Sequence, residues 1–299
     1  MRVDPNYVSN LAASLQQSSS AEAALSNQLS SGLRINSLQD DPTAVAQSTL
    51  MASAIAKDDT FVHTASGLTS LIQVADSTLG EVVSQLTSAL SLAVQGGNGT
   101  LNPANLTAVA QQLSGIRDQV LSLANTTYLG QSLFAGSQGS VKPFALDIST
   151  TPATSSYAGD TTLRYVETPS GQKIQTNLVG SDVFGSGNSG VLGALNQLIA
   201  DFASGAVSAT SSLDTAALSS ALGHLSSQRS ILDSSLSRLQ ATSTYTQTEE
   251  TQLKVQQGNL VSADPVAIAT QLKSAEVQRQ ALMSVMSTVQ KNNLFDYLQ

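Results

Sequence analysis

The sequence contains no cysteine and no tryptophan, and only 4% of its residues are aromatic. The absence of cysteine excludes disulfide bonds and thiolate metal sites. Charged residues make up 11%, whereas an average soluble domain has about 25%. Ser, Thr, Gln and Asn fill many polar positions instead, so the core must be built mainly from Leu, Val, Ala and Ile.

Positive charge and long apolar runs are both scarce. The 13 Lys and Arg residues stand against 21 Asp and Glu, which gives a formal net charge of -8. Nucleic acids and anionic membranes need a basic surface, so we expect neither as a partner. No stretch approaches the roughly 18 apolar residues of a membrane span, and we expect no membrane insertion. Residues 1–30 also lack the apolar run of a secretory signal, which favours a cytosolic protein or another export route.

Residue patterns that carry catalysis or metal binding are missing as well. The two histidines, His63 and His224, do not have metal-ligand spacing. The acidic pairs Asp58-Asp59 and Glu249-Glu250 are adjacent in sequence, so their members do not share a helix face. Residues 185–190 are rich in glycine but lack the Lys-Ser/Thr of a phosphate-binding loop. We therefore expect a protein that is not an enzyme and has no cofactor and no metal.

Three helix starts are marked by a side-chain cap followed by proline: Asp41-Pro42, Asn102-Pro103 and Asp264-Pro265. Gly32 predicts the end of the first helix because glycine tolerates a positive φ. Gly96-Gly97 predicts the end of the second helix, and the third is expected to end near Gly130. Asp214 predicts the cap of another long helix that runs to about Leu260.

Apolar residues at alternating spacings of four and three indicate coiled-coil seams in these helices. The rhythm is unbroken in the second helix, from Phe61 to Ala93, and less regular near both ends of the chain. The first helix has Glu22 as its one charge between Pro5 and Gly32, so it would be marginal alone. The two terminal helices are expected to pair with each other or with neighbouring subunits. An apolar tip at Leu294–Leu298 also predicts a burial partner.

The middle of the chain has a different composition, rich in Gly, Pro, Thr and Ser. Residues 161–167 and 173–179 read as two strands joined by a turn at 168–171. A glycine-rich segment from Gly180 to Gly193 leads into a short helix. The sequence predicts a mainly α fold: a long antiparallel helical bundle or coiled coil formed by the N- and C-terminal regions, with a small β-rich insert.

This pattern predicts three structural parts. Residues 1–34 and 262–299 form a terminal coiled-coil assembly domain, residues 35–136 and 194–261 form a helical bundle domain, and residues 137–193 form an outer β-rich insert domain.

The stretch Leu29-Ser30-Ser31-Gly32-Leu33-Arg34-Ile35-Asn36-Ser37, followed by Asp40-Asp41-Pro42, resembles the N-terminal signature of the flagellin superfamily almost residue for residue. Other segments resemble the hook-associated proteins of the hook–filament junction within that superfamily. These segments are Tyr128–Gly136, Tyr157–Asp160, Val179–Gly185 and the ending Asn293–Leu298.

The resemblance implies a structural component of the bacterial flagellum that self-assembles and connects hook to filament. It implies secretion through the flagellar type III export apparatus, with a cytosolic export chaperone holding the C-terminal region beforehand. The implied partners are further copies of the chain, a neighbouring hook-associated protein and filament flagellin. Two alternatives stay open: a short filament flagellin, and an exported coiled-coil adhesin or translocator.

The residues expected at the assembly interface come from the two terminal helices and from the joint after the first helix, residues 29–46. Polar contacts of Arg34 with Asp40 or Asp41 are expected between neighbouring subunits. The full set is Leu11, Leu15, Leu25, Leu29, Arg34, Asn36, Asp41, Ile268, Leu272, Leu282, Met286, Val289 and Phe295.

Overall fold

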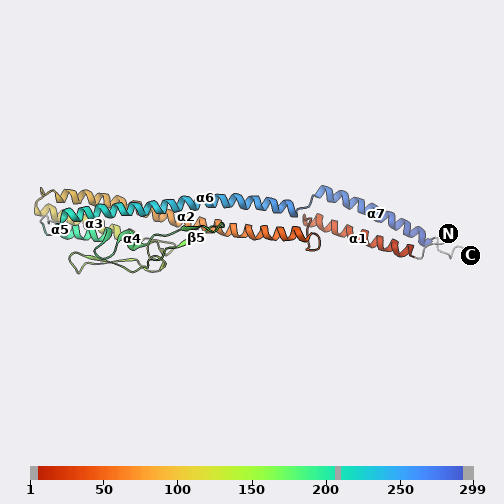
Figure 1. The fold of residues 1–299 in the computed structure, drawn as a ribbon, viewed down its shortest axis with the longest axis horizontal. Coiled ribbons are helices and arrows are strands. Elements are labelled where there is room, and N and C mark those ends of the chain that lie inside the picture. The colour runs from red at the N-terminus through yellow and green to blue at the C-terminus, as the bar shows by residue number, and fades with distance from the viewer. Residues whose placement is uncertain (1–5, 206–209, 292–299) are drawn as a thin grey trace, which may run out of the picture. The chain divides into compact units, whose positions relative to one another are not determined.

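The computed structural model describes residues 6–205 and 210–291, in which helices predominate (Figure 1). The helices are α1 (Tyr7–Ser31), α2 (Pro42–Gly97), α3 (Pro103–Ala124), α4 (Gly180–Phe184), α5 (Gly190–Ala203), α6 (Ser211–Val261) and α7 (Pro265–Lys291). The strands are β1 (Thr127–Tyr128), β2 (Gln131–Ser132), β3 (Phe144–Asp147), β4 (Thr154–Tyr157), β5 (Tyr165–Glu167) and β6 (Lys173–Gln175). The predicted fold class is confirmed.

Residue contacts divide the chain into two compact units. The terminal unit comprises Met1–Lys57 and Glu249–Gln299, and the central unit comprises Asp58–Thr248. Both boundaries fall inside long helices, within α2 and within α6. The β-containing segment belongs to the central unit, whereas the sequence prediction separated it as a third part.

Three helix ends lie at the capping residues that the sequence predicted. α1 ends at Gly32, whose φ is 69° and whose N–H donates to the Gln28 carbonyl. α3 begins at Pro103, and the Asn102 side chain accepts a hydrogen bond from the Asn105 N–H. α7 begins at Pro265, and Asp264 Oδ1 accepts from the N–H of Val266 at 2.9 Å. These caps satisfy donors that have no partner inside their helix.

The core of the central unit is built from the predicted heptad seams. From α2, Phe61, Ala65, Ile72, Leu79, Leu86 and Ala93 are buried, and α6 contributes Leu218, Leu225, Leu232 and Leu239. α3 packs against α5, which is apolar over most of its surface and supplies Leu192, Leu195 and Phe202 to the same cluster. Gly96 of α2 must be small, because a Cβ there would lie 2.8 Å from the Phe202 ring.

Arg229 of α6 continues the four-and-three spacing of Leu225 and Leu232, and it is paired with an acid although its side chain is 37% exposed. Its Nε lies 2.5 Å from Asp76 Oδ1, and its Nη2 lies 3.1 Å from Asp76 Oδ2. This two-point hydrogen bonding by Asp76 raises the pKa of Arg229 above its usual value. A cation can therefore occupy a coiled-coil position because an acid on α2 matches its planar geometry.

The β segment consists of three two-stranded antiparallel sheets. The hairpin predicted around 168–171 is confirmed, with Tyr165 opposite Gln175 and Glu167 opposite Lys173, although its strands are shorter than expected. Sequence reasoning did not find β3 and β4. They lie beside an aromatic cluster in which Phe144 meets the Phe184 ring edge-on at 5.5 Å.

Three local predictions were wrong. α3 ends at Ala124 rather than near Gly130, because Asn125 closes the helix by donating from its side chain to the Leu121 and Phe144 carbonyls. α6 begins at Ser211, so Asp214 lies in its first turn rather than at its cap. The segment from Gly180 to Gly193 is not simply a glycine-rich exit, because it contains α4 and the start of α5.

Asn196 of α5 tests how strictly the central core excludes polar groups. Its side chain is 2% exposed, and neither its amide oxygen nor its amide nitrogen has a hydrogen-bond partner. Because an unpaired buried amide costs about 1–3 kcal/mol, we expect Asn196→Leu to raise the free energy of unfolding of the central unit by about 1 kcal/mol. Hydrogen exchange of the central-unit amides, followed at increasing urea concentrations, would measure this free energy of unfolding.

Asn105→Leu, at an exposed position of α3, is the matched control and should change stability little. Destabilisation by Asn196→Leu would contradict the prediction and indicate that the amide has a partner in solution.

Candidate functional site

The helices α1 and α7 pack side by side in the terminal unit (Figure 1). The predicted seam residues Leu11, Leu15 and Leu25 are half-buried, as are Leu272, Leu282 and Met286 of α7. Ile268 is buried, with 5% of its surface exposed, and Leu29 is 42% exposed. A two-helix pair therefore covers these seams only in part.

The terminal unit has few fully buried apolar residues compared with the central unit. Among its described residues, the buried hydrophobic positions are Ile35, Ala44 and Ile268. Apolar surface left in water is unfavourable by roughly 25 cal/mol per Å². The terminal unit is therefore the part of the chain with most to gain from a further packing partner.

An ion pair interrupts the α1–α7 seam. Glu22 Oε2 lies 2.7 Å from Arg279 Nε, and both side chains are partly exposed. The Arg279 N–H makes no directed hydrogen bond to that oxygen. One turn before Glu22, the hydroxyl of Ser18 is buried without a hydrogen-bond partner. The seam thus contains a matched pair of charges between its apolar layers.

A short backbone bridge joins the segment after α1 to the segment before α7. The Arg34 N–H donates to the Val261 carbonyl at 2.8 Å, and the Ala263 N–H donates to the Gly32 carbonyl at 3.0 Å. Leu33 and Ser262 form the antiparallel bridge between these bonds. The turn at Gly32 and the break between α6 and α7 are therefore tied together.

Arg34 makes its contacts within its own chain. Its Nη2 donates to the Leu260 carbonyl at 3.0 Å, which places a cation at the carboxyl end of α6. Its Nη1 lies 3.8 Å from Asp41 Oδ2. The arginine side chain is still 49% exposed, so a contact with a neighbouring subunit stays a prediction.

The two aspartates of the joint have separate tasks. Asp40 Oδ2 accepts from the N–H groups of Asn36 and Ser37, at 2.9 and 2.8 Å, and these bonds lower its pKa below the ordinary value of 3.8. Asp41 accepts from the Ala44 N–H at 3.0 Å and so caps α2. This backbone bond is the main reason that the pKa of Asp41 is also lowered.

Apolar side chains of the joint remain accessible around a hollow of about 240 Å³, lined partly by Ile35, Asn36 and Val45. Leu38, which also lines it, is 65% exposed, and Leu33 is 41% exposed. The predicted interface residue Asn36 thus lies at an open apolar surface rather than in a closed core.

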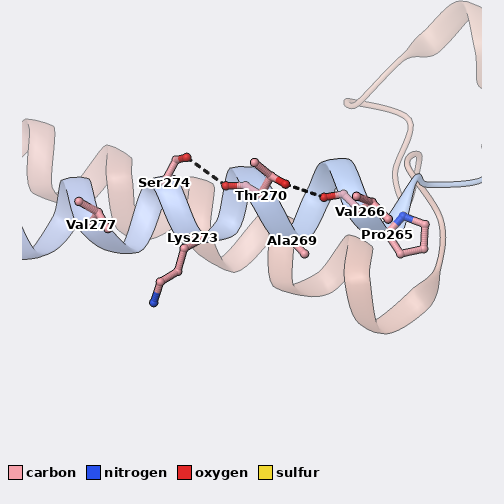
Figure 2. A pocket seen from close by; sticks show the side chains of 7 residues that line it. All are labelled: Pro265, Val266, Ala269, Thr270, Lys273, Ser274 and Val277. Carbon is pink, nitrogen blue, oxygen red and sulfur yellow. Dashed lines mark hydrogen bonds between the residues drawn. The ribbon is translucent and has the colours of Figure 1, made fainter.

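A second apolar stripe lies on α7, and sequence reasoning missed it. Val266, Thr270, Lys273 and Val277 repeat the spacing of four and three, each two positions away from a seam residue. Two residues correspond to about 200° around a helix, so this stripe lies opposite the α1-facing seam. It lines a shallow hollow of about 870 Å³ (Figure 2). Counting a second heptad phase along α7 could have found it.

Within the described residues, no helix is long and apolar enough to cross a membrane. The same part of the chain contains no group of three or more His, Cys, Asp or Glu residues that could hold a metal ion.

Comparison with known families matches both helical regions. The bacterial flagellin N-terminal helical region matches residues 6–139, and the bacterial flagellin C-terminal helical region matches residues 215–298. Together they leave only the middle of the chain and a few terminal residues unmatched.

The chain belongs to the flagellin family.

Individual members of this family resemble the chain over part of its length. Flagellar hook-associated protein 3 of Salmonella typhimurium is 33% identical over 121 residues, which cover 40% of this chain and 38% of that protein. Polar flagellin F of Vibrio parahaemolyticus is 30% identical over 112 residues, 37% of this chain and 30% of that protein. The chain therefore aligns with well under half of either relative.

A solved structure extends the likeness of the fold. Flagellar hook associated protein-3 from Legionella pneumophila has a TM-score of 0.64 and covers 71% of this chain and 98% of its own. At 16% identity this agreement concerns the fold alone. The mainly helical flagellin-like fold with its small β segment is thus shared with a hook-associated protein.

The predicted interface residues lie in two neighbouring regions of the terminal unit. The apolar ones from α1 and α7 line the seam, and Arg34, Asn36 and Asp41 lie in the joint. The side chain of Val289 and the whole of Phe295 lie outside the described residues. The role of the set in assembly stays a prediction.

The Glu22–Arg279 pair should contribute to the pairing of α1 with α7. Because the pair is partly exposed, we expect Arg279→Ala to lower the protection of α1 and α7 amides against hydrogen exchange about two- to five-fold, or about 0.5–1 kcal/mol. The doubly reversed variant Glu22→Arg with Arg279→Glu should recover most of this protection. Equal losses in the single and reversed variants would contradict a direct pairing.

The joint should lose order in acid. Because the folded pKa of Asp40 is lowered from its ordinary value of 3.8, its two backbone hydrogen bonds stabilise the joint above that value and are lost as the pH falls through the folded pKa. An NMR titration of the Asn36 and Ser37 amide protons should therefore show a midpoint below 3.8. Asp40→Asn should abolish that transition, and a wild-type midpoint above 3.8 would contradict the assignment.

Proposed function

We propose that this chain is a structural component of the bacterial flagellum, a hook–filament junction protein that self-assembles and connects hook to filament. The observation that carries the proposal is the half-covered apolar surface of the terminal unit. It includes the seam of α1 and α7, the joint, and the outer stripe of α7, which is the second apolar stripe described above. A protein that functions as part of a packed assembly can leave such surface for its neighbours to bury.

The relatives support a junction role over other roles in the family. The Salmonella protein named above is a hook-associated protein, and the Legionella neighbour with the same fold is also named for the hook. The partners in this proposal are further copies of the chain, a neighbouring hook-associated protein and filament flagellin. The activity is structural, and the chain is not an enzyme.

Export also suits the thin packing of the terminal unit. We place the protein outside the cell, after passage through the flagellar type III export apparatus, with a cytosolic export chaperone holding its C-terminal region beforehand. Helices that are only half-buried can be unfolded at low cost. Assembly would then stabilise the same helices by mass action.

A short filament flagellin is the second candidate, and the likeness to polar flagellin F favours it. The two roles differ in where the protein lies. Immunogold labelling of purified hook–filament preparations, with antibodies raised against the central unit, should give a single band at the end of the hook. Labelling along the whole filament would overturn the junction role in favour of the flagellin role.

Assembly should depend on the α1-facing seam of α7. We expect Leu282→Asp to abolish filament growth in a strain that lacks the wild-type gene. Leu282 is half-buried between α1 and α7, so an aspartate there would place a charge between the two helices. Gln278→Asp, one exposed position on the same helix, introduces the same charge and should leave filament growth within about twofold of wild type. Motility halos and electron microscopy would measure both.

Export must be checked alongside, by probing culture supernatants for each variant. If Leu282→Asp is exported and filaments still grow normally, the seam is not needed for assembly. A deletion within residues 137–193 should be tolerated better than loss of residues 268–299.

A further inference from the structure

A pocket of about 400 Å³ opens between the β5–β6 hairpin and α6, within the central unit. Its walls come from Tyr165, Lys173 and Gln175 of the hairpin and from one face of α6 between residues 230 and 238. The volume is within the range of sites that hold a small group. None of the residues assigned above to assembly belongs to it.

Charge distinguishes this pocket from the rest of the chain. Lys173 and Arg238 both line it, and neither forms an ion pair in the described parts of the molecule. No acidic side chain lines the pocket. Glu167 is the strand partner of Lys173 but does not come within ion-pair distance, and Asp233 of α6 is not part of the wall. Two uncompensated cations therefore share one pocket in a chain with a net charge of -8.

A serine in the same wall has a hydroxyl that is not bonded to the helix backbone. Ser235 is only 6% exposed, and its hydroxyl makes no hydrogen bond within the described residues. Ser226 on the same helix shows the usual alternative, since its hydroxyl donates to the Leu222 carbonyl at 2.9 Å. Because the Ser235 hydroxyl lines the pocket and makes no hydrogen bond inside the described protein, it can donate one to a ligand.

The chemistry of the wall selects the ligand. Ammonium, guanidinium and hydroxyl groups all donate hydrogen bonds, and the two cations add a favourable field for a negative group. Tyr165 and Ile231 are 53% and 43% exposed at the rim, where they can cover the methylene groups of an entering side chain. A carboxylate on a short aliphatic stem, as in Asp or Glu, meets each of these features.

We propose that this pocket binds an acidic side chain from a second copy of the chain. The excess of eight negative charges supplies acidic side chains on each copy, and a neighbour in an assembly would bring one to the pocket at high local concentration. This step rests on the proposed self-assembly. The contact is separate from the apolar seam, and it would add orientation through charge complementarity rather than buried area.

Zero-length carbodiimide coupling tests the contact, because it joins a lysine amine to a carboxylate only where the two touch. The full-length protein would be treated in purified hook–filament preparations and, separately, as a concentrated purified chain. We expect a cross-linked dimer in which Lys173 is joined to an Asp or Glu of another copy, identified by peptide mapping. A link between Lys173 and Glu167 of one chain leaves a monomer and does not count.

Two variants and one control make the result specific. Lys173→Arg keeps the charge but removes the reactive amine, and it should lower the dimer yield at least fivefold. Arg238→Gln keeps the reactive lysine but removes one cation, and it should lower the yield at least threefold. Lys142→Arg removes another exposed lysine of the central unit and should leave the yield unchanged.

A dimer yield that does not respond to Lys173→Arg in either sample would overturn the proposal. A Lys173 link to a different protein would overturn the choice of a second copy. If antibodies do not find the chain in flagella, the junction role fails, and the purified chain alone then decides the pocket. The two failures are therefore distinguishable.

Discussion

Two backbone hydrogen bonds, from Arg34 to Val261 and from Ala263 to Gly32, determine how the terminal unit is organised. They tie together two helix breaks that are more than 200 residues apart in sequence. The Asp41 cap then starts α2 and the Asp264 cap starts α7, so a capped helix follows each break. Without this bridge, the pairing of α1 with α7 would depend on a seam that is only half-buried. The joint is therefore a structural tie as well as a change of direction.

Those parts of the fold that depend on local chemistry could be predicted from the sequence. Gly32, Asn102-Pro103 and Asp264-Pro265 act on their own helix ends, and an unbroken heptad rhythm identifies the buried face of α2. The β3–β4 pair could not be found in this way, because its strands are short and the sequence of one strand does not show which other strand it pairs with. The start of α6 was missed for a similar reason: the hydroxyl of Ser211 bonds to Asp201, ten residues earlier, and that contact is not visible in the local sequence.

The candidate site was predictable in its residues but not in its geometry. The seam leucines follow from their spacing, whereas the choice of Arg34 followed from the resemblance and a hypothesis about neighbouring subunits. In the structure Arg34 reaches the end of α6 in its own chain, a contact between residues 226 positions apart. The outer stripe of α7 was hidden because Thr270 and Lys273 interrupt its apolar character. Its own spacing of four and three could have shown it, but that it faces away from α1 became clear only from the packing of α1 against α7.

The ion pair between Glu22 and Arg279 has a consequence for the register of the coiled coil. A slip of one heptad would set Glu22 opposite Leu272 or Met286 instead of Arg279, and both charges would lose their partner. Apolar layers alone would tolerate such a slip, because leucine, methionine and isoleucine pack against one another almost interchangeably. A single charged layer thus specifies the register of the two helices. It lets the two helices find one alignment out of several that are nearly equal in apolar contact.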